Sequence, residues 1–336
     1  LYYAEPWIDL SADFRYGAFK DAAFQLAQLK LHAPELDCRL LIGDGIREAI
    51  AREGFTEHRD LALGVLHLDD LKAVYRDANT AAKAFLREEA TEDELEQLAR
   101  LCHRALPGFE PDIVLMHETH APFIARAYPS ALVLHSMYGM TYRMPHPRLS
   151  LFDPAGLYQR SLLARHGHEI RARAIPEADQ PVLKELRNWF AAQITPHDPA
   201  WPLIEPEQSR FDKLLLLPLQ VDGYYAFEHC SEFKTQEELV EHVLRAAPRT
   251  WGVVVTEHSE FKPSLDDLTV QRLRRSHANF IYKKELNAIP YVSQALLAHV
   301  DAVVSVSSSL ALQALIFDCP VVAAGDSHVN AVATCG

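Results

Sequence analysis

Short apolar runs alternate with amphipathic stretches along the whole chain. In the first half, one helical pattern covers 17–30, and another, with an acidic first turn, covers 90–106. The apolar run at 61–68 suits either a strand or the start of a helix. The runs that read as strands in this half lie at 38–43, 111–118 and 131–136. Such alternation predicts an α/β domain with a parallel sheet.

The second half repeats this alternation after a proline-bearing segment at 177–210, which carries one helix and reads as a connection. Its predicted strands lie at 213–220, 252–258, 301–307 and 320–325. At 336 residues the chain has the length of two domains. We therefore expect two Rossmann-like, doubly wound parallel sheets that face a central cleft, in domains at 1–176 and 211–336.

Three serines stand between a strand and a helix in the stretch SVSSSLALQALIFDCPVVAAG, which begins at Ser305. The strand, the serine turn, the helix at 308–318 and the next strand form one βαβ unit, and Ser307 or Ser308 is expected to cap the helix. Such a helix begins at the carboxyl edge of the sheet, where its N–H groups and the three hydroxyls can hold a phosphate. The alternative is a capped helix without a ligand.

Polar residues also follow two other predicted strands. Glu257 and His258 come directly after the run GVVVT, and Gln220, Asp222 and Gly223 come after KLLLLPL. Because parallel strands end at one edge of the sheet, we expect these side chains and the serine turn to line one crevice. Taken singly, the histidine suits a structural hydrogen bond, and the Asp-Gly pair suits an ordinary turn.

Composition restricts the classes of ligand. The formal net charge is −13, from 46 acidic and 33 basic residues, which argues against a nucleic-acid binder. No run approaches the roughly 20 apolar residues of a membrane span, and we expect no signal peptide. The chain opens on leucine and stops directly after a strand, so we expect it to be trimmed at both ends. Five dispersed cysteines without a CxxC pair suit a reducing cytoplasm: Cys38, Cys102, Cys230, Cys319 and Cys335.

Several common motifs are missing from the sequence. GxxxxGK[ST] does not occur, GDGIRE at 43–48 lacks the third glycine of a dinucleotide loop, and the histidines show neither HExxH nor another metal-ligand spacing. Asp-x-Asp, a usual place to hold a divalent ion on a nucleotide-sugar diphosphate, does not occur either. A donor with a single phosphate and no metal fits this pattern.

Three stretches of the second half together resemble the bacterial capsule polysaccharide Kdo transferases. LLLLPLQVDGYYAF, VVVTEHSEF and VVSVSSSLALQALIFDCPVVAAG are similar to the family's PLQ-x-D strand end, K-E-H-P strand end and NSS-x-G-x-E-A-L…G-x-P-V turn. In the first half, 138–158 resembles the family's stretch with E-x-G-x-x-R-P…T-x-E-x-x-G. The matches follow the family's order and are most similar to the β-Kdo transferase domains of some O-antigen polymer enzymes.

This resemblance implies two domains of the GT-B fold, a CMP-β-Kdo donor and retention at the anomeric carbon. The implied reaction moves 3-deoxy-manno-octulosonic acid (Kdo) to a sugar hydroxyl of a bacterial surface polysaccharide, in capsule or lipopolysaccharide O-antigen. The chain departs from the family at positions that bear on the acceptor and on the acid/base. These are Thr256 for Lys, Ser259 for Pro, Ser136 or Met137 for Glu, and Gln313 for Glu.

The CMP phosphate has the best-supported expected contacts. His258 is the strongest of them, because its resemblance extends to enzymes that use CMP-sialic acid and hold the CMP phosphate with a comparable histidine and serine pair. The helix N–H groups and serine hydroxyls would stabilise the leaving phosphate. The expected CMP-binding residues are Glu257, His258, Ser307, Ser308 and Ser309.

Retention by double displacement needs a carboxylate below the sugar ring. Asp222 is the expected nucleophile, because it follows a strand end and Gly223 leaves room for the sugar. A base must also activate the acceptor hydroxyl, and Glu118 in the first domain is the candidate. Three histidines compete with it, namely His117, His120 and His135.

Gln220, Arg143 and Arg148 are expected to hold the Kdo carboxylate or the acceptor, although the arginines could equally lie on the surface. The expected partners are the CMP-sugar donor, an oligosaccharide or lipid-linked glycan acceptor, and further glycosyltransferase domains of the same polypeptide. The expected location is the cytoplasm or the inner membrane face. Two alternatives stay open, a GT-B-fold nucleotide-sugar epimerase or hydrolase and a non-catalytic nucleotide-sugar-binding or polymer-binding domain.

Overall fold

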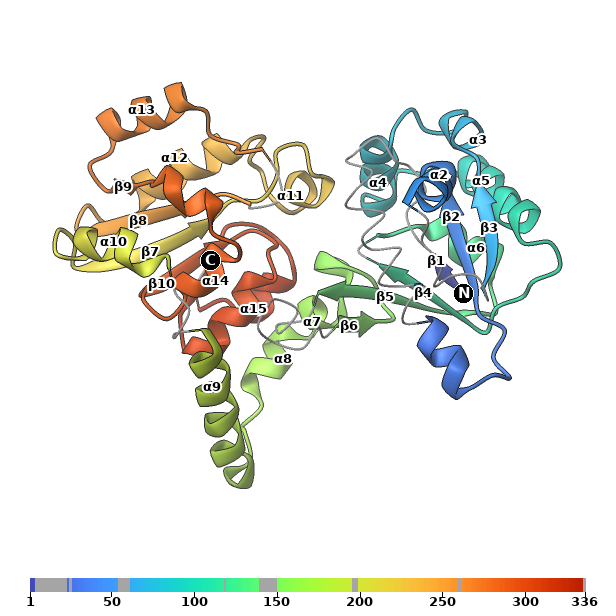
Figure 1. Cartoon of the computed structure of the whole chain (residues 1–336), viewed down its shortest axis with the longest axis horizontal. Coiled ribbons are helices and arrows are strands. Elements are labelled where there is room, and N and C mark those ends of the chain that lie inside the picture. The colour runs from blue at the N-terminus through green and yellow to red at the C-terminus, as the bar shows by residue number, and fades with distance from the viewer. Residues whose placement is uncertain are drawn as a thin grey trace. The chain divides into compact units, whose positions relative to one another are not determined.

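The computed structural model describes residues 1–3, 23, 26–53, 61–117, 119–138, 150–194, 199–258 and 262–334. The chain divides into two compact units. The first comprises Leu1–Met137 and Phe152–Leu157, and the second comprises Tyr138–Leu151 and Tyr158–Gly336. Each unit is built around its own sheet (Figure 1).

The first unit is organised by a six-stranded sheet of β1 (Tyr2–Tyr3), β2 (Arg39–Gly43), β3 (Ala62–Leu66), β4 (Ile113–His117), β5 (Leu132–Tyr138) and β6 (Ser150–Asp153). The strand order is β3-β2-β1-β4-β5-β6. The pairings that join β1 to β5 are parallel, and β1 has β2 on one side and β4 on the other. The order therefore reverses between β1 and β4, as in a doubly wound sheet.

Helices cover both faces of this sheet. They are α2 (Asp44–Glu53), α3 (Leu68–Lys72), α4 (Ala78–Leu86), α5 (Glu92–Ala105) and α6 (Pro122–Ala127). Tyr3 and Leu41 pack with residues of α4, α5 and α6. Tyr2 and Leu40 pack with Ile46 of α2 in a separate cluster. Because neighbouring residues of a strand point to opposite faces, each central strand contributes to both cores.

The second unit holds a five-stranded sheet of β7 (Lys213–Pro218), β8 (Trp251–Thr256), β9 (Phe280–Ile281), β10 (Ala302–Ser305) and β11 (Val321–Ala323). The order is β11-β10-β7-β8-β9, and the pairings are parallel. The first strand, β7, is central and pairs with both β8 and β10. The order thus reverses at the β7–β10 pair, after the chain has crossed back over the sheet.

The two faces of the second sheet are also covered by helices (Figure 1). α12 (Gln236–Ala246) and α13 (Asp267–Ser276) lie on one face, and α14 (Val292–Leu296) and α15 (Leu310–Ala314) lie on the other. Leu214 and Leu216 of β7 belong to the core with α14 and α15. Leu215 and Leu217 are buried too, and they point to the opposite face. Burial on both faces accounts for the unbroken leucine run of β7.

Shorter helical segments complete the second unit. They are η1 (Tyr158–Arg160), α7 (Leu162–Arg165), α8 (Gly167–Ala172), α11 (Tyr225–Cys230), η4 (Lys284–Ala288), η5 (Leu315–Phe317) and η6 (His328–Ala331). A glycine is required where the chain leaves β11, because a Cβ on Gly325 would lie 2.2 Å from the backbone oxygen of Cys230. The adjoining Asp326 N–H donates to that same oxygen at 2.7 Å, so the segment after β11 is fastened to α11.

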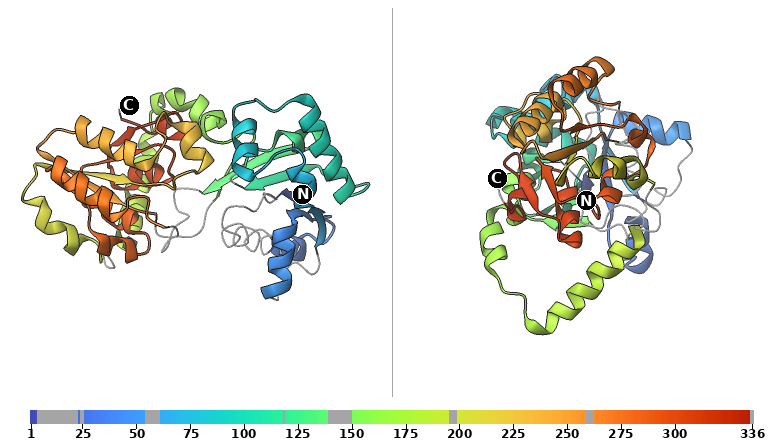
Figure 2. Two further views of the ribbon diagram at one scale, coloured as in Figure 1. Left: turned by 90° about the horizontal axis from the view of Figure 1, so that it is seen from above. Right: turned by 90° about the vertical axis from the view of Figure 1, so that its left-hand side faces the viewer.

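Residues 177–210 belong to the second unit. They contain η2 (Glu177–Asp179), α9 (Gln180–Ile194) and α10 (Trp201–Gln208), and α9 extends away from the sheet (Figures 1 and 2). Ile204 of α10 is buried in the core of this unit, and Arg187 of α9 forms an ion pair with Asp318, before β11. These contacts join both helices to the second unit, and the expected domain boundaries at residues 176 and 211 stay a prediction.

The fold class predicted from the sequence is confirmed. Every apolar run read as a strand contains one, and the run at 61–68 contains β3. The helix expected at 308–318 is shorter, because α15 ends at Ala314 and η5 continues it as a tighter turn. Ser309 occupies the N-cap position without a side-chain cap. Of the helix expected at 17–30, only residue 23 and the part from 26 onward lie among the described residues.

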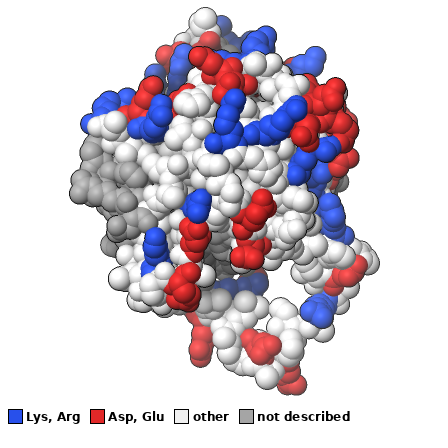
Figure 3. Space-filling model, turned by 90° about the vertical axis from the view of Figure 1, so that its right-hand side faces the viewer, with Lys and Arg blue, Asp and Glu red and all other residues white. Residues whose placement is uncertain are grey.

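Charged side chains of both signs are interspersed over the face shown in Figure 3. In the first unit, Arg104 forms an ion pair with Asp70 at 2.6 Å, and Arg39 forms one with Asp37 at 2.8 Å. Of the helices that the structure describes, none is long and apolar enough to cross a membrane.

Candidate functional site

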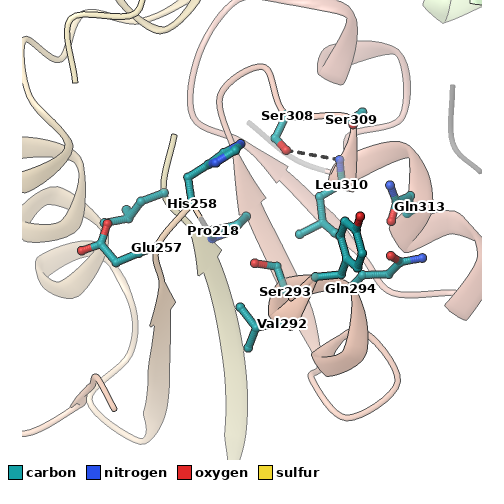
Figure 4. A pocket seen from close by; sticks show the side chains of 12 residues that line it. Pro218, Glu257, His258, Val292, Ser293, Gln294, Ser308, Ser309, Leu310 and Gln313 are labelled. Carbon is teal, nitrogen blue, oxygen red and sulfur yellow. Dashed lines mark hydrogen bonds between the residues drawn. The ribbon is translucent and has the colours of Figure 1, made fainter. Parts of the chain in front are cut away.

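The reversal of strand order at β7 and β10 is the position at which parallel α/β sheets bind ligands. A pocket lies there in the second unit (Figure 4). Its walls come from the segments after β7 and β8, from the start of α14 and from the serine turn after β10. Four residues predicted to bind CMP line it: Glu257, His258, Ser308 and Ser309.

The serine turn is fastened to the end of β7 by Gln220. The Nε2 group of Gln220 donates to Ser307 Oγ at 3.0 Å, and the Ser307 N–H donates to Gln220 Oε1 at 3.4 Å. Neither residue lines the pocket. Within the turn, the Ser308 N–H donates to Ser305 Oγ at 3.2 Å, and Ser308 Oγ accepts from the Leu310 N–H at 3.3 Å. Gln220 and Ser307 therefore hold the turn in place, while Ser308 and Ser309 face the pocket.

His258 and Glu257 point in different directions. The imidazole of His258 extends toward Ser308, whereas the carboxylate of Glu257 points away from the serines (Figure 4). That carboxylate accepts from the Ser264 N–H and the Leu265 N–H, each at 3.1 Å. Burial raises the pKa of Glu257 above its usual range, although the two N–H donors act in the opposite direction. Of this pair, His258 is thus the one turned toward a ligand at the serines.

Asp222 lies at the same edge of the sheet, just beyond β7. It is exposed, and its Oδ1 accepts from the N–H of Gln236, the first residue of α12, at 2.7 Å. The adjoining Gly223 has φ +72, a conformation that glycine adopts without strain. The carboxylate therefore binds a helix start in this structure, and the Asp-Gly pair forms a turn. The role of Asp222 as the nucleophile stays a prediction.

Two buried glutamines also line the pocket. Gln294 on α14 is 4% exposed, and Gln313 on α15 is 2% exposed. The side-chain oxygen of each is buried without a hydrogen-bond partner in the structure. The two side chains lie together on the side of the pocket opposite Glu257 (Figure 4). Buried polar atoms without partners are uncommon and destabilise the folded protein. The two glutamines are therefore unusual among the residues that line the pocket.

The start of α14 supplies the residues that sequence reasoning missed. Tyr291, Ser293 and Gln294 all line the pocket. Ser293 Oγ lies 2.7 Å from the hydroxyl of Thr256. Thr256 stands where the Kdo transferases that the sequence resembles have lysine. Tyr291 has φ +57 and ψ +29, a strained conformation for a non-glycine residue. A helix that follows a strand in such a fold begins at the carboxyl edge of the sheet, but the sequence patterns did not predict β9 (Phe280–Ile281), the strand that precedes this helix.

In the first unit the structure brings two of the competing histidines together. Nδ1 of His120 and Nε2 of His135 lie 3.3 Å apart, and the rings stack with centroids 5.4 Å apart. Nδ1 of His135 lies 3.3 Å from the backbone oxygen of Asp153. The other candidates for base and acceptor binding lie outside the described residues: Glu118, Arg143, Arg148 and the side chain of His117.

Within the described part of the chain, no group of three or more His, Cys, Asp and Glu side chains is arranged to hold a metal ion. The expectation that the chain works without a metal stays a prediction.

The sequence of the second half matches a known family. Residues 178–331 match the family described as capsule polysaccharide biosynthesis protein. This segment contains β7 to β11 and the residues that the structure shows lining the pocket. The resemblance predicted from the sequence is therefore confirmed for this part of the chain. No curated protein matches the chain in sequence.

Several solved structures are similar to the chain. KpsC of Thermosulfurimonas dismutans, a β-Kdo 2,7 transferase, has 17% identity and a TM-score of 0.43, and the match covers 75% of this chain and 78% of that one. The calicheamicin glycosyltransferase CalG4 has 16% identity and a TM-score of 0.36, with 96% and 78% covered. The Escherichia coli heptosyltransferase WaaC has 13% identity and a TM-score of 0.25, with 96% and 87% covered. Likenesses this distant carry no information on the reaction of this chain.

Proposed function

Because residues 178–331 belong to the capsule polysaccharide biosynthesis family, we propose that the chain is a retaining glycosyltransferase that uses CMP-β-Kdo. In this proposal it moves Kdo to a sugar hydroxyl of a bacterial surface polysaccharide. One observation carries the proposal: the polar residues after β8 and β10 line a single pocket at the β7–β10 reversal. Among the described residues that line it, that pocket offers hydroxyls and an imidazole but no lysine or arginine, which suits one phosphate better than two.

The leaving group of the proposed reaction is CMP, which departs with the electrons of the bond between Kdo and its phosphate. Ser308, Ser309 and His258 are suited to bind that phosphate, because hydroxyls and a protonated or neutral imidazole N–H donate hydrogen bonds. Gln220 and Ser307 keep the turn in position through their mutual hydrogen bonds. Hydrogen bonds to the phosphate that strengthen as its charge develops lower the barrier to departure.

Retention requires two displacements at the anomeric carbon. In the first, a carboxylate oxygen of Asp222 attacks that carbon while CMP leaves, which forms a glycosyl ester. In the second, the acceptor hydroxyl attacks the same carbon, loses its proton to a base and releases Asp222. Glu118 is the proposed base, with His117, His120 and His135 as the competing candidates. Gln220, Arg143 and Arg148 are the proposed contacts of the Kdo carboxylate or the acceptor.

Binding of CMP tests the donor site directly. CMP should raise the thermal unfolding temperature, because a ligand that binds only the folded state stabilises it by mass action. Replacing His258 with alanine should weaken CMP binding at least about tenfold, the effect of one strong hydrogen bond. Isothermal titration calorimetry measures the CMP affinity of the unaltered protein and of His258→Ala. His277→Ala, which changes a histidine of the same unit outside the pocket, is the matched control and should bind CMP normally.

Two results would contradict this assignment. Unchanged CMP affinity in His258→Ala would mean that the phosphate lies elsewhere. Stabilisation by UDP but not by CMP would favour a nucleotide-sugar epimerase or hydrolase, and stabilisation by neither would favour a domain without a nucleotide donor.

A further inference from the structure

The wall of the pocket formed by α14 and α15 contains two hydrogen-bond acceptors that no described residue of the protein satisfies. They are the side-chain oxygens of Gln294 and Gln313, both buried and both without a hydrogen-bond partner in the structure. Their residues are 4% and 2% exposed. An amide oxygen that is removed from water without a partner destabilises the folded protein. A residue of leucine or methionine size would avoid that loss, so the chain carries these amides at a cost to its stability.

We propose that these two oxygens accept hydrogen bonds from the nucleoside part of the donor, and that they give the pocket its preference among nucleotides. This inference rests on the proposed function and adds to it the groups that recognise the nucleoside. Both amides come from helices that begin at the carboxyl edge of the sheet, as the serine turn does. The pocket would then hold the phosphate at Ser308 and Ser309 and the nucleoside beside α14 and α15.

The partners of these oxygens must donate hydrogen bonds, and in a CMP-sugar the donors are the hydroxyl groups and the amine of cytosine. The phosphate and the Kdo carboxylate present oxygens that accept hydrogen bonds, and such oxygens repel the amide oxygens of Gln294 and Gln313. Ribose hydroxyls and the exocyclic amine of cytosine donate hydrogen bonds, so they match these acceptors. Gln313 follows Ser309 by four residues, which puts both on one side of α15. A ribose joined to the bound phosphate is therefore within reach of this wall.

An aromatic ring adds a second element of recognition. Tyr291 lines the same pocket and is 36% exposed. It stands directly before α14, three residues ahead of Gln294. Bases stack on aromatic side chains with little regard to sequence, so Tyr291 offers a surface to any base, and discrimination falls to the polar groups beside it. A ring next to an acceptor oxygen suits a base that carries an amine.

The proposal predicts opposite effects on stability and on binding. Gln313→Leu and Gln294→Leu remove an unsatisfied buried acceptor, so the ligand-free protein should unfold at a higher temperature than the unaltered protein. The same variants lose a hydrogen bond to the ligand, so CMP should bind about tenfold more weakly. Gln313→Met and Gln294→Met keep the unbranched shape and should behave alike. A purely structural role would not produce this combination.

The experiment measures thermal unfolding without ligand and calorimetric affinities for CMP, 2′-deoxy-CMP and UMP, in the unaltered protein and in each variant. If a ribose hydroxyl is the donor, the unaltered protein binds 2′-deoxy-CMP more weakly than CMP, and the relevant variant loses that difference. If the cytosine amine is the donor, the unaltered protein binds UMP more weakly than CMP, and the relevant variant loses that difference. Such a cycle isolates the interaction between the two altered groups.

Asn79→Leu serves as the matched control, because its buried side-chain oxygen also lacks a partner but lies on α4 of the first unit. It should leave CMP affinity unchanged. Normal CMP affinity in all four glutamine variants, with CMP still bound by the unaltered protein, would overturn this inference alone. Failure of the unaltered protein to bind CMP would overturn the proposed function and this inference with it. Lower unfolding temperatures in both the leucine and the methionine variants would show that the amides have partners within the protein.

Discussion

At the scale of single residues, Glu257 and His258, which follow β8 directly, make different contacts. Consecutive side chains of an extended segment point in opposite directions, so Glu257 reaches the N–H groups of Ser264 and Leu265 while His258 turns to the serines. Oxygens of a carboxylate accept hydrogen bonds and repel a phosphate. We therefore expect Glu257 to hold the backbone at Ser264 and Leu265, and His258 to contact the ligand.

Asp222→Asn separates a catalytic carboxylate from a turn residue. Asparagine keeps the oxygen that accepts from the Gln236 N–H, so the fold and the CMP affinity should be retained. A neutral amide cannot form the glycosyl ester, so transfer of Kdo should fall by about a thousandfold or more. Turnover of CMP-β-Kdo, followed by chromatography of the products, measures the rate.

The matched control for this substitution is Asp266→Asn. Asp266 also accepts from the N–H groups at a helix start, with Thr269 N at 2.7 Å, but it caps α13 and does not line the pocket. Its variant should transfer Kdo at the normal rate. A folded Asp222→Asn protein with near-normal transfer would end the proposal for Asp222, and a normal rate with inverted product would indicate a single displacement.

At the scale of elements, η6 is built around a histidine that water does not reach. His328 is 2% exposed, and neither ring nitrogen has a hydrogen-bond partner in the structure. Its ring lies against Tyr158, with centroids 6.2 Å apart. On the neighbouring helix α8, a Cβ on Gly167 would lie 2.7 Å from the Cα of Ala331, so the backbones approach closely. Burial lowers the pKa of His328 to about 4, because the charged imidazole would lose its water.

This histidine predicts a loss of stability in mild acid. Unfolded, its imidazole binds a proton below its ordinary value of 6.5, whereas in the fold it does so only below about 4. The unfolded state therefore binds more protons in that window, and the free energy of unfolding falls as the pH drops from 6.5 to 4, by roughly 3 kcal/mol from this group. His328→Leu should lack this part of the loss in denaturant titrations at pH 7, 5.5 and 4.5.

An exposed histidine provides the comparison for that measurement. His32→Leu changes a side chain on the surface of the first unit and should follow the pH dependence of the unaltered protein. If His328→Leu follows that same dependence, the imidazole of His328 is hydrated or paired when the protein is folded.

The strands of both sheets could largely be predicted from the sequence, because a buried strand is visible as a local run of apolar residues. β7 and β8 each contain an unbroken run of leucines or valines. Such a run is typical of a strand that is buried on both faces. The sequence predicted the pocket in part, since Glu257, His258, Ser308 and Ser309 follow strands. It could not predict Gln294 or the direction of the Glu257 carboxylate, because both depend on which helix returns beside which strand. It could not predict the hydrogen bonds between Ser307 and Gln220 either, because they form only when β10 lies beside β7. The assignment of Ser307 to the phosphate stays a prediction.

At the scale of the whole molecule, the described residues that line the proposed nucleotide pocket all belong to the second unit. The first unit contributes a sheet of the same doubly wound kind, with the contacting His120 and His135 near the carboxyl ends of β4 and β5. The segment that matches the capsule family covers the second unit from α9 to η6. Recognition of the donor can therefore be examined through substitutions in one unit alone.

In the proposed reaction, the protein should transfer Kdo without a divalent metal. A single phosphate carries less charge than a diphosphate, and the hydroxyls of the serine turn together with His258 can offset it. The rate measured with the intact protein in excess EDTA should equal the rate in magnesium. A rate that EDTA abolishes and magnesium restores would contradict this prediction.

The position of β7 has a consequence for the chain while it is being made. β7 finds its first partner in β8, but its second edge stays open until β10 arrives, and Leu214 and Asp301, which join these strands, stand 87 residues apart. At ribosomal rates of 5–20 residues per second this gap lasts roughly 4–17 seconds. During that time an apolar strand, KLLLLP, presents unpaired N–H and C=O groups, which is the arrangement that recruits other strands and starts aggregation. A low concentration of nascent chains and a chaperone that shields such edges should therefore favour recovery of the folded protein.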